Sequence, residues 1–573
     1  MVDPFKLNRS WQLAPQPDHQ LLSELSSELE VPSVILGILI RGGHESVESI
    51  DLFLNPGLDQ LESPFSLSGM DAAVERIVKA VVDGERILIY GDYDVDGVTS
   101  VALLVRALRS VGGLVDYRIP HRLLDGYGLS TKSMERAHQE GAGLIITVDC
   151  GVTAREEVEL ASKLGMDVVV TDHHHPQGDI PAALAVINPK LESEPGPFYD
   201  LAGVGLAFKL AQAVYDRLDL SPEEIFDYLD LVALGVIADV VPLSGENRIL
   251  ARHGLMKLPA TEKAGLKTLL DRLGFLGGSV SAGQILFSIA PRINAMGRMS
   301  DASRVVELLT TNSEETSREI VSEMEENNDR RRQLDGRIYQ EAEAKALELY
   351  DPASRRTLCL SSADWHPGVI GIVASRLVET FHRPTVLICE DGGDSKGSAR
   401  SIPGFDLYQA MERSSGHLVK FGGHTYAVGL TIEAGNIESF RAEFESVATE
   451  MLTAEDLVPK LYIDDRIGFR MTNWDLMKYL RLLSPFGHGN RRPVFLTENA
   501  EIVGPARRVG NDHLKLRLRQ EGVTMEAIGF GMGALAETIS SGCANADVVY
   551  ILDTNEYQGR VGLQLKIKDI RVW

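Results

Sequence analysis

Residues 86–97 read RILIYGDYDVDG, an apolar run that leads directly into three aspartates. The same arrangement returns at 144–150 (LIITVDC) and at 168–176 (VVVTDHHHP). One more apolar run lies at 115–119. Segments of helical character lie between these runs, at 98–110, 132–140 and 155–164. Short apolar runs that alternate with helical segments are typical of βαβ units. We therefore predict an α/β fold whose first sheet is parallel.

The pattern changes further along the chain. Residues 200–280 read as helical, and DYLDLVALGVIADV at 227–240 is apolar enough to predict a buried helix. Residues 314–348 are highly charged and predict a long, solvent-exposed connecting helix, and strand-like alternation dominates after 458. These changes predict an N-terminal segment at 1–75, an α/β domain with a helical subregion at 76–312, the connecting helix at 313–350, a second mixed α/β domain at 351–457 and a C-terminal β-barrel at 458–573.

Composition limits the possible partners. The 57 Lys and Arg against 82 Asp and Glu give a net charge of −25, which excludes a general attraction to nucleic acid or to an anionic membrane. Residues 501–573 hold nine basic and nine acidic residues, so a local basic surface is still compatible with that part. Four dispersed cysteines without a C-x-x-C pair disfavour a cysteine zinc site and fit a reducing compartment. No apolar run near the N-terminus is long enough to span a bilayer or to form a signal peptide, so we predict a cytoplasmic protein without a membrane partner.

The acidic ends of the predicted strands indicate a metal site. The carboxyl ends of parallel strands meet at one edge of a sheet, where ligands of open α/β folds bind. Carboxylates gathered there repel one another unless a cation neutralises them, and carboxylate with imidazole suits Mn²⁺, Mg²⁺ or Zn²⁺. Asp239 is a further acid, and it lies at the end of the apolar 227–240 segment, where an unpaired charge is costly. Each aspartate taken singly also fits a helix cap or a turn, and the His173–His175 run fits a satisfied turn.

The motifs resemble those of a known family. GDYDVDG (91–97), TVDCG (147–151), TDHHHP (171–176) and ALGVIADVVPL (233–243) resemble, in order, the four motifs of the DHH phosphoesterase superfamily. Four later stretches resemble the companion DHHA1 domain: APRINAMGR (290–298), WHPGVIGIVASRL (365–377), GSARS (397–401) and FGGHTYAVGL (421–430). With a C-terminal β-domain, the chain from about residue 70 onward resembles the RecJ family of single-strand-specific 5′→3′ DNA exonucleases, which implies an OB-fold at 458–573.

The resemblance implies two Mn²⁺ or Mg²⁺ ions between the DHH and DHHA1 domains. Asp94 and Asp149 would hold one ion; Asp96, Asp149, His173 and Asp239 would hold the other, with Asp149 bridging. Asp92 and His174 would act as catalytic residues that support the site, with His174 facing the scissile phosphate. Two metals can activate water and stabilise both the attacking and the leaving oxygen, so no covalent nucleophile is required. Cys150, where the family often has Asn, and the third histidine, His175, depart from the family pattern; Cys150 would make the site oxidisable or be a small buried apolar residue.

The resemblance also implies the substrate-binding residues, namely Arg122, Arg298, Ser398, Arg400, Gly422, Gly423 and His424. For each arginine a surface salt bridge is the competing interpretation, and for the glycines a turn. A nucleic-acid-binding role in the OB-fold is expected for Arg507, Arg508, Lys515, Arg517 and Arg519. A solvated strand face is the alternative interpretation of these five residues.

Three other functions compete with the predicted exonuclease. A DHH phosphodiesterase for short oligonucleotides or cyclic dinucleotides would lack the extra β-domain. An inactive DNA-binding scaffold would have lost metal ligands, whereas every expected ligand is present. A nicotinamide dehydrogenase would need a G-x-G-x-x-G after the first strand, which is absent. For the exonuclease the expected partners are single-stranded DNA and, from the resemblance, a single-strand-binding protein and a helicase, with the chain itself a monomer.

Overall fold

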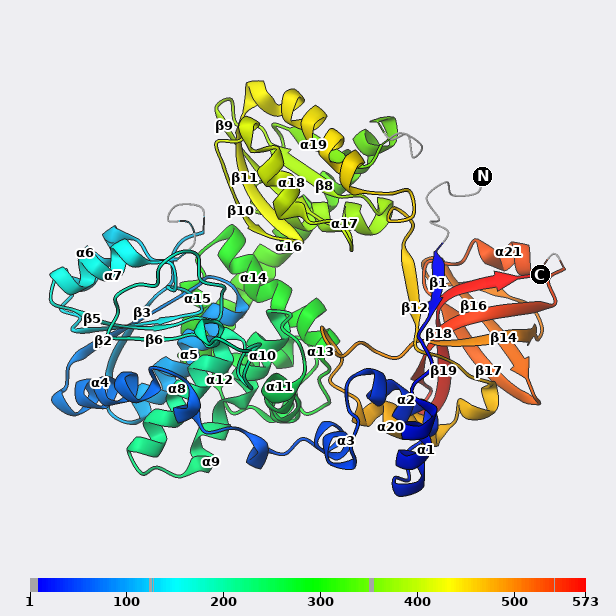
Figure 1. Cartoon of the computed structure of the whole chain (residues 1–573), viewed down its shortest axis with the longest axis horizontal. Coiled ribbons are helices and arrows are strands. Elements are labelled where there is room, and N and C mark those ends of the chain that lie inside the picture. The colour runs from blue at the N-terminus through cyan, green and yellow to red at the C-terminus, as the bar shows by residue number, and fades with distance from the viewer. Residues whose placement is uncertain (1–8, 123–125, 127, 350–354, 541) are drawn as a thin grey trace. The chain divides into compact units, whose positions relative to one another are not determined.

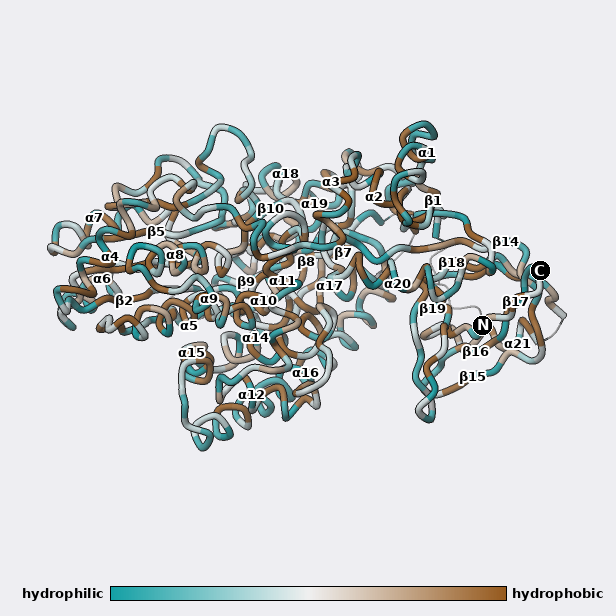
Figure 2. The backbone as a smooth tube through the Cα atoms, turned by 90° about the horizontal axis from the view of Figure 1, so that it is seen from below, coloured by the Kyte–Doolittle hydropathy of each residue, from teal (hydrophilic) through white to brown (hydrophobic). Residues whose placement is uncertain are grey.

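The computed structural model describes residues 9–122, 126, 128–349, 355–540 and 542–573 (Figure 1). The chain forms two compact units. One consists of Met1–Trp11, Asn294–Asp301 and Ser322–Leu461, and the other of Gln12–Ile293, Ala302–Val321 and Tyr462–Trp573. Hydrophobic and hydrophilic residues alternate along helices and strands of the chain, as they do in elements with one buried face (Figure 2).

The larger unit contains the predicted parallel sheet. Its order is β3-β2-β4-β5-β6, and every neighbouring pair is parallel. The strands are β2 (Arg86–Gly91), β3 (Leu114–Arg118), β4 (Leu144–Val148), β5 (Asp167–Thr171) and β6 (Ala185–Ile187). α4 (Met70–Asp83) precedes β2, and the helices that connect successive strands are α5 (Val95–Ser110), α6 (Thr131–Gln139) and α7 (Arg155–Lys163). β4 is buried along its whole length, as expected for a strand covered by helices on both faces.

The predicted helical subregion follows this sheet. It contains α8 (Gly203–Arg217), α9 (Pro222–Ile225), α10 (Leu229–Ala238), α11 (Gly245–Lys257) and α12 (Ala264–Arg272). Three more helices follow it: α13 (Ala282–Gln284), α14 (Ala290–Met299), of which the part from Asn294 belongs to the smaller unit, and α15 (Ser303–Thr310). α10 is buried at every position from Leu229 to Ile237, which confirms the prediction for the apolar segment at 227–240. A 3-10 turn at Phe226–Tyr228 precedes the helix, so it begins two residues later than the sequence suggested.

The C-terminal sheet of the same unit closes on itself, because β14 pairs with both β18 and β16. Its strands are β13 (Asp465–Arg466), β14 (Phe495–Ile502), β15 (Arg507–Val509), β16 (His513–Gln520), β17 (Val523–Gly529), β18 (Asn545–Tyr557) and β19 (Arg560–Val572), with α20 (Trp474–Leu482) and α21 (Leu535–Ser540) beside them. This is the predicted β-barrel.

The N-terminal helices share the hydrophobic core of this barrel. They are α1 (His19–Glu28), α2 (Ser33–Arg41) and α3 (Val47–Leu54), and they contribute Leu25, Ile35 and Leu39 to the cluster that contains Phe495 and Leu516. Strand β1 (Ser10–Leu13) pairs with β12 (Lys460–Ile463). The two ends of the chain are therefore one packing unit, which no local sequence pattern indicates.

The smaller unit is built on a mixed sheet of order β10-β11-β9-β8-β7. Its strands are β7 (Leu358–Ser362), β8 (Thr385–Cys389), β9 (Asp394–Arg400), β10 (Lys420–His424) and β11 (Ala427–Glu433), with α17 (Ile370–Phe381), α18 (Leu407–Arg413) and α19 (Ile437–Met451). The long helix α16 (Glu314–Leu349) was predicted almost to the residue. It is not solvent-exposed all round, because Ile338, Ala342 and Ala346 are buried against β7 and α17 residues. Among the described residues, no helix has the length and apolar character needed to cross a membrane.

Candidate metal centre

The first three aspartates lie where β2 gives way to α5. Asp92 follows the strand, and Asp94 caps the helix by accepting a hydrogen bond from the Gly97 amide (3.1 Å). The helix begins at Val95 rather than at Val98 as predicted, because the Asp94 cap starts it earlier. Asp96 therefore lies in its first turn, buried, instead of in a loop. A Cβ on Gly97 would lie 2.4 Å from the Asp92 carbonyl oxygen, so the tight turn requires glycine there.

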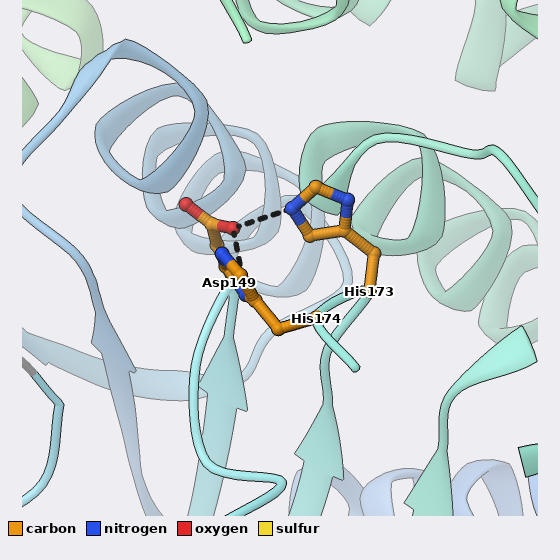
Figure 3. Close-up of side chains that lie close together, drawn as sticks. All are labelled: Asp149, His173 and His174. Carbon is orange, nitrogen blue, oxygen red and sulfur yellow. Dashed lines mark ion pairs between the residues drawn. The ribbon is translucent and has the colours of Figure 1, made fainter. Parts of the chain in front are cut away.

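Asp149 and the two histidines meet beyond the ends of β4 and β5 (Figure 3). His173 Nε2 lies 3.1 Å from Asp149 Oδ1, and His174 Nδ1 lies 4.0 Å from the same oxygen. Asp149 has a φ of 58°, a left-handed conformation that costs energy outside glycine. Such strain persists only where the surroundings hold it, and it is common at functional sites.

Asp96 and Asp239 complete the cluster from the helical side. The amides of Gly203 and Val204, the first two residues of α8, donate to the two Asp96 oxygens at 2.7 and 2.9 Å. Asp239 ends α10, and its Oδ2 lies 3.6 Å from His173 Nε2. A helix N-terminus favours negative charge, so α8 stabilises the buried Asp96 carboxylate.

Asp172 is a site residue that the sequence analysis did not assign. Its Oδ1 contacts His174 Nδ1 at 2.7 Å, and its Oδ2 accepts from the Val152 amide at 2.9 Å. Although burial opposes both charges, this pairing lowers the pKa of Asp172 and raises the pKa of His174. Asn188 also holds the segment by donating to the His174 carbonyl oxygen (2.9 Å). The Asp-His-His sequence was the available signal, because an acid two residues before a histidine can bond back to it.

The electrostatics of the cluster favour a bound cation. Burial, followed by the charge of Asp94, raises the pKa of Asp92 to about 8 and that of Asp96 to about 7. Burial, followed by the charge of Asp96, also raises the pKa values of Asp149 and Asp239 well above their ordinary range. A divalent cation would remove this repulsion, and its binding would release protons.

The donor set fits such a cation. Ligand atoms gather in three overlapping groups, each within 4.8 Å: Asp149 with His173 and His174, Asp96 with His173 and Asp239, and Asp92 with Asp94 and Asp149. Two buried atoms, Asp92 Oδ1 and His173 Nε2, have no hydrogen-bond partner among the described residues. Burial, followed by the charge of His174, lowers the pKa of His173 to about 3, so its imidazole is neutral and able to ligate a metal. All seven predicted metal-site and catalytic residues thus lie in one cluster of the larger unit.

Arg122 and Cys150 lie near this cluster. The Arg122 guanidinium is 5.0 Å from the centre of the ring of Tyr93, the residue between Asp92 and Asp94, and its charge offsets a small part of the rise that burial causes in the pKa of Asp92. Cys150 is fully buried, and burial raises the pKa of its thiol well above the ordinary value. Of the two interpretations offered for Cys150, this environment favours the small buried apolar residue.

The remaining predicted substrate residues gather in the smaller unit. Ser398, Gly429 and Gly422 face one another across β9, β11 and β10, and Arg400, Ala427 and His424 form the next such row, so these side chains share one face. The start of α17 lies over Ser398 and Arg400, because a Cβ on Gly371 would come within 2.9 Å of both side chains. Arg298 donates to the Gly368 carbonyl oxygen just before that helix (3.0 Å). Gly423 has a φ of 147° and no room for a Cβ, whereas Gly422 has open space around it.

The basic residues of the barrel are largely paired. Arg519 makes two bonds to Glu501 (2.8 and 2.6 Å), Arg508 pairs with Asp512 (2.9 Å) and Lys515 with Glu526 (3.7 Å). Lys515, Arg517 and Arg519 do point outward from β16, as the alternation indicated. Only Arg507 and Arg517 of the five have no carboxylate partner in the part of the chain that the structure describes.

Comparisons with known proteins agree with this geometry. The family model for the DHH family N-terminal domain matches residues 86–236, that for the DHHA1 domain matches 355–450, and that for the RecJ OB domain matches 463–569. The fold and site thus define a DHH phosphoesterase.

Relatives that share one name and match nearly the whole of this chain identify the particular family. The single-stranded-DNA-specific exonuclease RecJ of Bacillus subtilis is 36% identical over 98% of this chain and 71% of its own length. That of Dickeya dadantii is also 36% identical, over 96% and 99%. The crystal structure of Thermus thermophilus RecJ in complex with Mn²⁺ matches with a TM-score of 0.84 at 31% identity, over 98% of this chain and 79% of that one. The chain belongs to the RecJ family.

Proposed function

We propose that this chain is a metal-dependent exonuclease that degrades single-stranded DNA from the 5′ end by hydrolysing phosphodiester bonds. The observation that carries the proposal is the convergence of Asp94, Asp96, Asp149, His173 and Asp239 in overlapping ligand groups of carboxylate and imidazole. Relatives named RecJ support the substrate, and RecJ structures with Mn²⁺ and with Mg²⁺ support the choice of cation.

In this proposal Asp94 and Asp149 hold one Mn²⁺ or Mg²⁺, and Asp96, Asp149, His173 and Asp239 hold the other. Two such ions supply a hydroxide near neutral pH and stabilise the charge that develops on the phosphate. The protein's own contribution is to fix the ligands: α8 amides hold Asp96, and the strained backbone at Asp149 aims its carboxylate toward both histidines.

His174 and Asp92 are the proposed catalytic residues. Asp172 contacts His174 Nδ1 and so fixes the orientation of the imidazole, which we propose donates a proton or a hydrogen bond to a phosphate oxygen. The raised pKa of His174 keeps that proton present to a higher pH than in a free imidazole. Asp92, buried beside Asp94, supports the ligands of the first ion.

The DNA contacts are proposed to come from two places. Arg122 adds a positive charge beside the metal ligands, and Arg298, Ser398, Arg400, Gly422, Gly423 and His424 form a phosphate-binding face in the smaller unit. In the barrel, we propose that Arg507 and Arg517 are the residues that bind DNA. The charges of Arg508, Lys515 and Arg519 are partly neutralised by acidic partners. We also propose the division of the chain into five regions, at 1–75, 76–312, 313–350, 351–457 and 458–573.

The biological setting is proposed from the family and from the cysteines. DNA repair and recombination agree with the family, and a single-strand-binding protein and a helicase are the expected partners of a monomeric chain. A cytoplasmic location agrees with four cysteines that form no disulfide.

The direct test is digestion of single-stranded DNA labelled at either end. We expect 5′-labelled DNA to lose its label first in Mn²⁺ or Mg²⁺, with no cleavage in chelator and little of blunt duplex. If the 3′ label were lost first, the proposed 5′→3′ direction of digestion would be wrong. Cleavage confined to dinucleotides or cyclic dinucleotides would favour the short-substrate phosphodiesterase, and binding without cleavage would favour the inactive scaffold.

Arg400→Ala tests the phosphate-binding face. We expect weaker binding to single-stranded DNA and a salt slope smaller by about 0.7, because one phosphate contact is lost. The measurement is a salt titration of binding in Ca²⁺, chosen to suppress turnover, with exposed Arg413→Ala as the control because Arg413 pairs with Glu450. A normal affinity with an unchanged slope would remove Arg400 from the DNA path.

A further inference from the structure

Three consecutive polar residues at the start of α11 are buried, which is unusual for charged and amide side chains. Glu246, Asn247 and Arg248 are 4%, 3% and 2% exposed. None of them belongs to the metal cluster, and each holds a different part of the larger unit.

Asn247 ties together two turns that are distant in sequence. Its Nδ2 donates to the Asp200 carbonyl oxygen at 2.6 Å and to the Pro242 carbonyl oxygen at 3.2 Å. Its Oδ1 accepts from the Ala202 amide at 3.4 Å. One buried amide group thus satisfies three backbone groups, which makes its loss costly.

Each of these turns leads directly into the metal cluster. Ala202 is the N-cap of α8, and the next two amides, of Gly203 and Val204, hold the carboxylate of Asp96. On the other side, Pro242 lies three residues after Asp239. Val240, between them, has a φ of 62°, a conformation that is strained for a β-branched residue and must be held by its surroundings.

The neighbours of Asn247 hold other segments. Glu246 pairs with buried Lys209 of α8 (2.9 Å) and accepts from the Glu62 amide (2.7 Å). The Arg248 guanidinium donates to the carbonyl oxygens of Phe53 (2.9 Å), Leu482 (2.9 Å), Leu483 (3.0 Å) and Ser484 (3.1 Å). Arg248 thus joins α11 to the N-terminal helices and to the end of α20, not to the metal cluster.

We propose that Asn247 is a positioning residue of the metal centre, which holds the turn before α8 and the turn after α10 at the separation that places Asp96 and Asp239 around one divalent cation. The inference rests on the proposed metal-dependent function. The Asn247 side chain touches neither ligand; it acts through the backbone of Ala202 and Pro242. The groups that bond Asp96 directly are the Gly203 and Val204 amides, and loss of such outer-shell partners typically weakens metal binding by about 10- to 100-fold.

The test compares Mn²⁺ binding by the full-length chain and by Asn247→Ala, measured by electron paramagnetic resonance without DNA. We expect the Mn²⁺ dissociation constant to rise at least about tenfold. Hydrogen exchange should be faster at the amides of Gly203 and Val204, which are bonded to Asp96. Arg248→Lys is the matched control: it should lower the melting temperature without changing Mn²⁺ affinity.

The outcomes separate this inference from the function on which it rests. If the unaltered chain bound no Mn²⁺, the proposed metal centre would fail, and Asn247 with it. If the unaltered chain bound Mn²⁺ and Asn247→Ala bound it equally well, only the positioning role would be overturned. Should Asn247→Ala not fold, Asn247→Asp keeps the size and the acceptor for Ala202 but loses the amide donors, and the same weakening of Mn²⁺ binding is expected; unchanged affinity would again overturn the role.

Discussion

Asp149→Ala should lower the rate of single-stranded DNA cleavage by at least about 1000-fold, equivalent to ~4 kcal/mol of transition-state stabilisation. Its carboxylate is shared by two of the three ligand groups and lies 3.1 Å from His173 Nε2, so its loss affects both proposed ions. Mutation of a single ligand elsewhere in the cluster would leave the other ion in place. The measurement is initial cleavage rate at saturating Mn²⁺.

Stability measurements distinguish this chemical role from a structural one. Burial and the neighbouring carboxylates raise the pKa of Asp149, so in chelator its charge opposes folding. Removing it should leave the metal-free melting temperature unchanged or higher, while abolishing the increase that Mn²⁺ gives the unaltered chain. Asp179→Ala, at an exposed residue paired with Arg155, is the control and should keep both activity and the Mn²⁺ effect. Full activity in Asp149→Ala would refute the ligand assignment.

The sequence predicted those parts of the site that depend on local patterns. The apolar runs before Asp92, Asp149 and Asp172 are each short enough for a strand and end in acid, and all three strands are where the pattern indicated. The buried helix before Asp239 was visible for the same reason, since apolar character at every position is a local property.

The sequence did not predict contacts that depend on packing between distant segments. The α8 amides on Asp96 join residues 107 and 108 positions apart, and the Arg248 bonds to the end of α20 span more than 230 positions. Pairing was also invisible on the barrel: a count of basic residues on β16 does not show that Glu501 lies opposite Arg519, or that Glu526 forms an ion pair with Lys515. These relationships arise only when strands and helices are placed beside one another.

Gly203→Ala should lower cleavage by about 100-fold and weaken Mn²⁺ binding, because this position has no room for a side chain. A Cβ there would lie 2.7 Å from Asp96 Oδ2 and 2.8 Å from the Asp149 Cβ, distances that real Cβ atoms do not adopt. Asp149 follows a strand inside the parallel sheet and cannot retreat, so α8 must move away and its two amides must leave Asp96. Loss of outer-shell hydrogen bonds of this kind typically costs about 10- to 100-fold in metal affinity or activity.

Gly336→Ala in α16 is the control, since nothing lies within 4 Å of its added Cβ. Exchange of glycine for alanine in a helix should stabilise the folded chain by up to ~1 kcal/mol. Cleavage rate, Mn²⁺ affinity and melting temperature are measured for both variants. Wild-type rate and affinity in Gly203→Ala would show that α8 does not hold Asp96 in the working site, whereas a fall in melting temperature alone would assign Gly203 to packing and not to the metal centre.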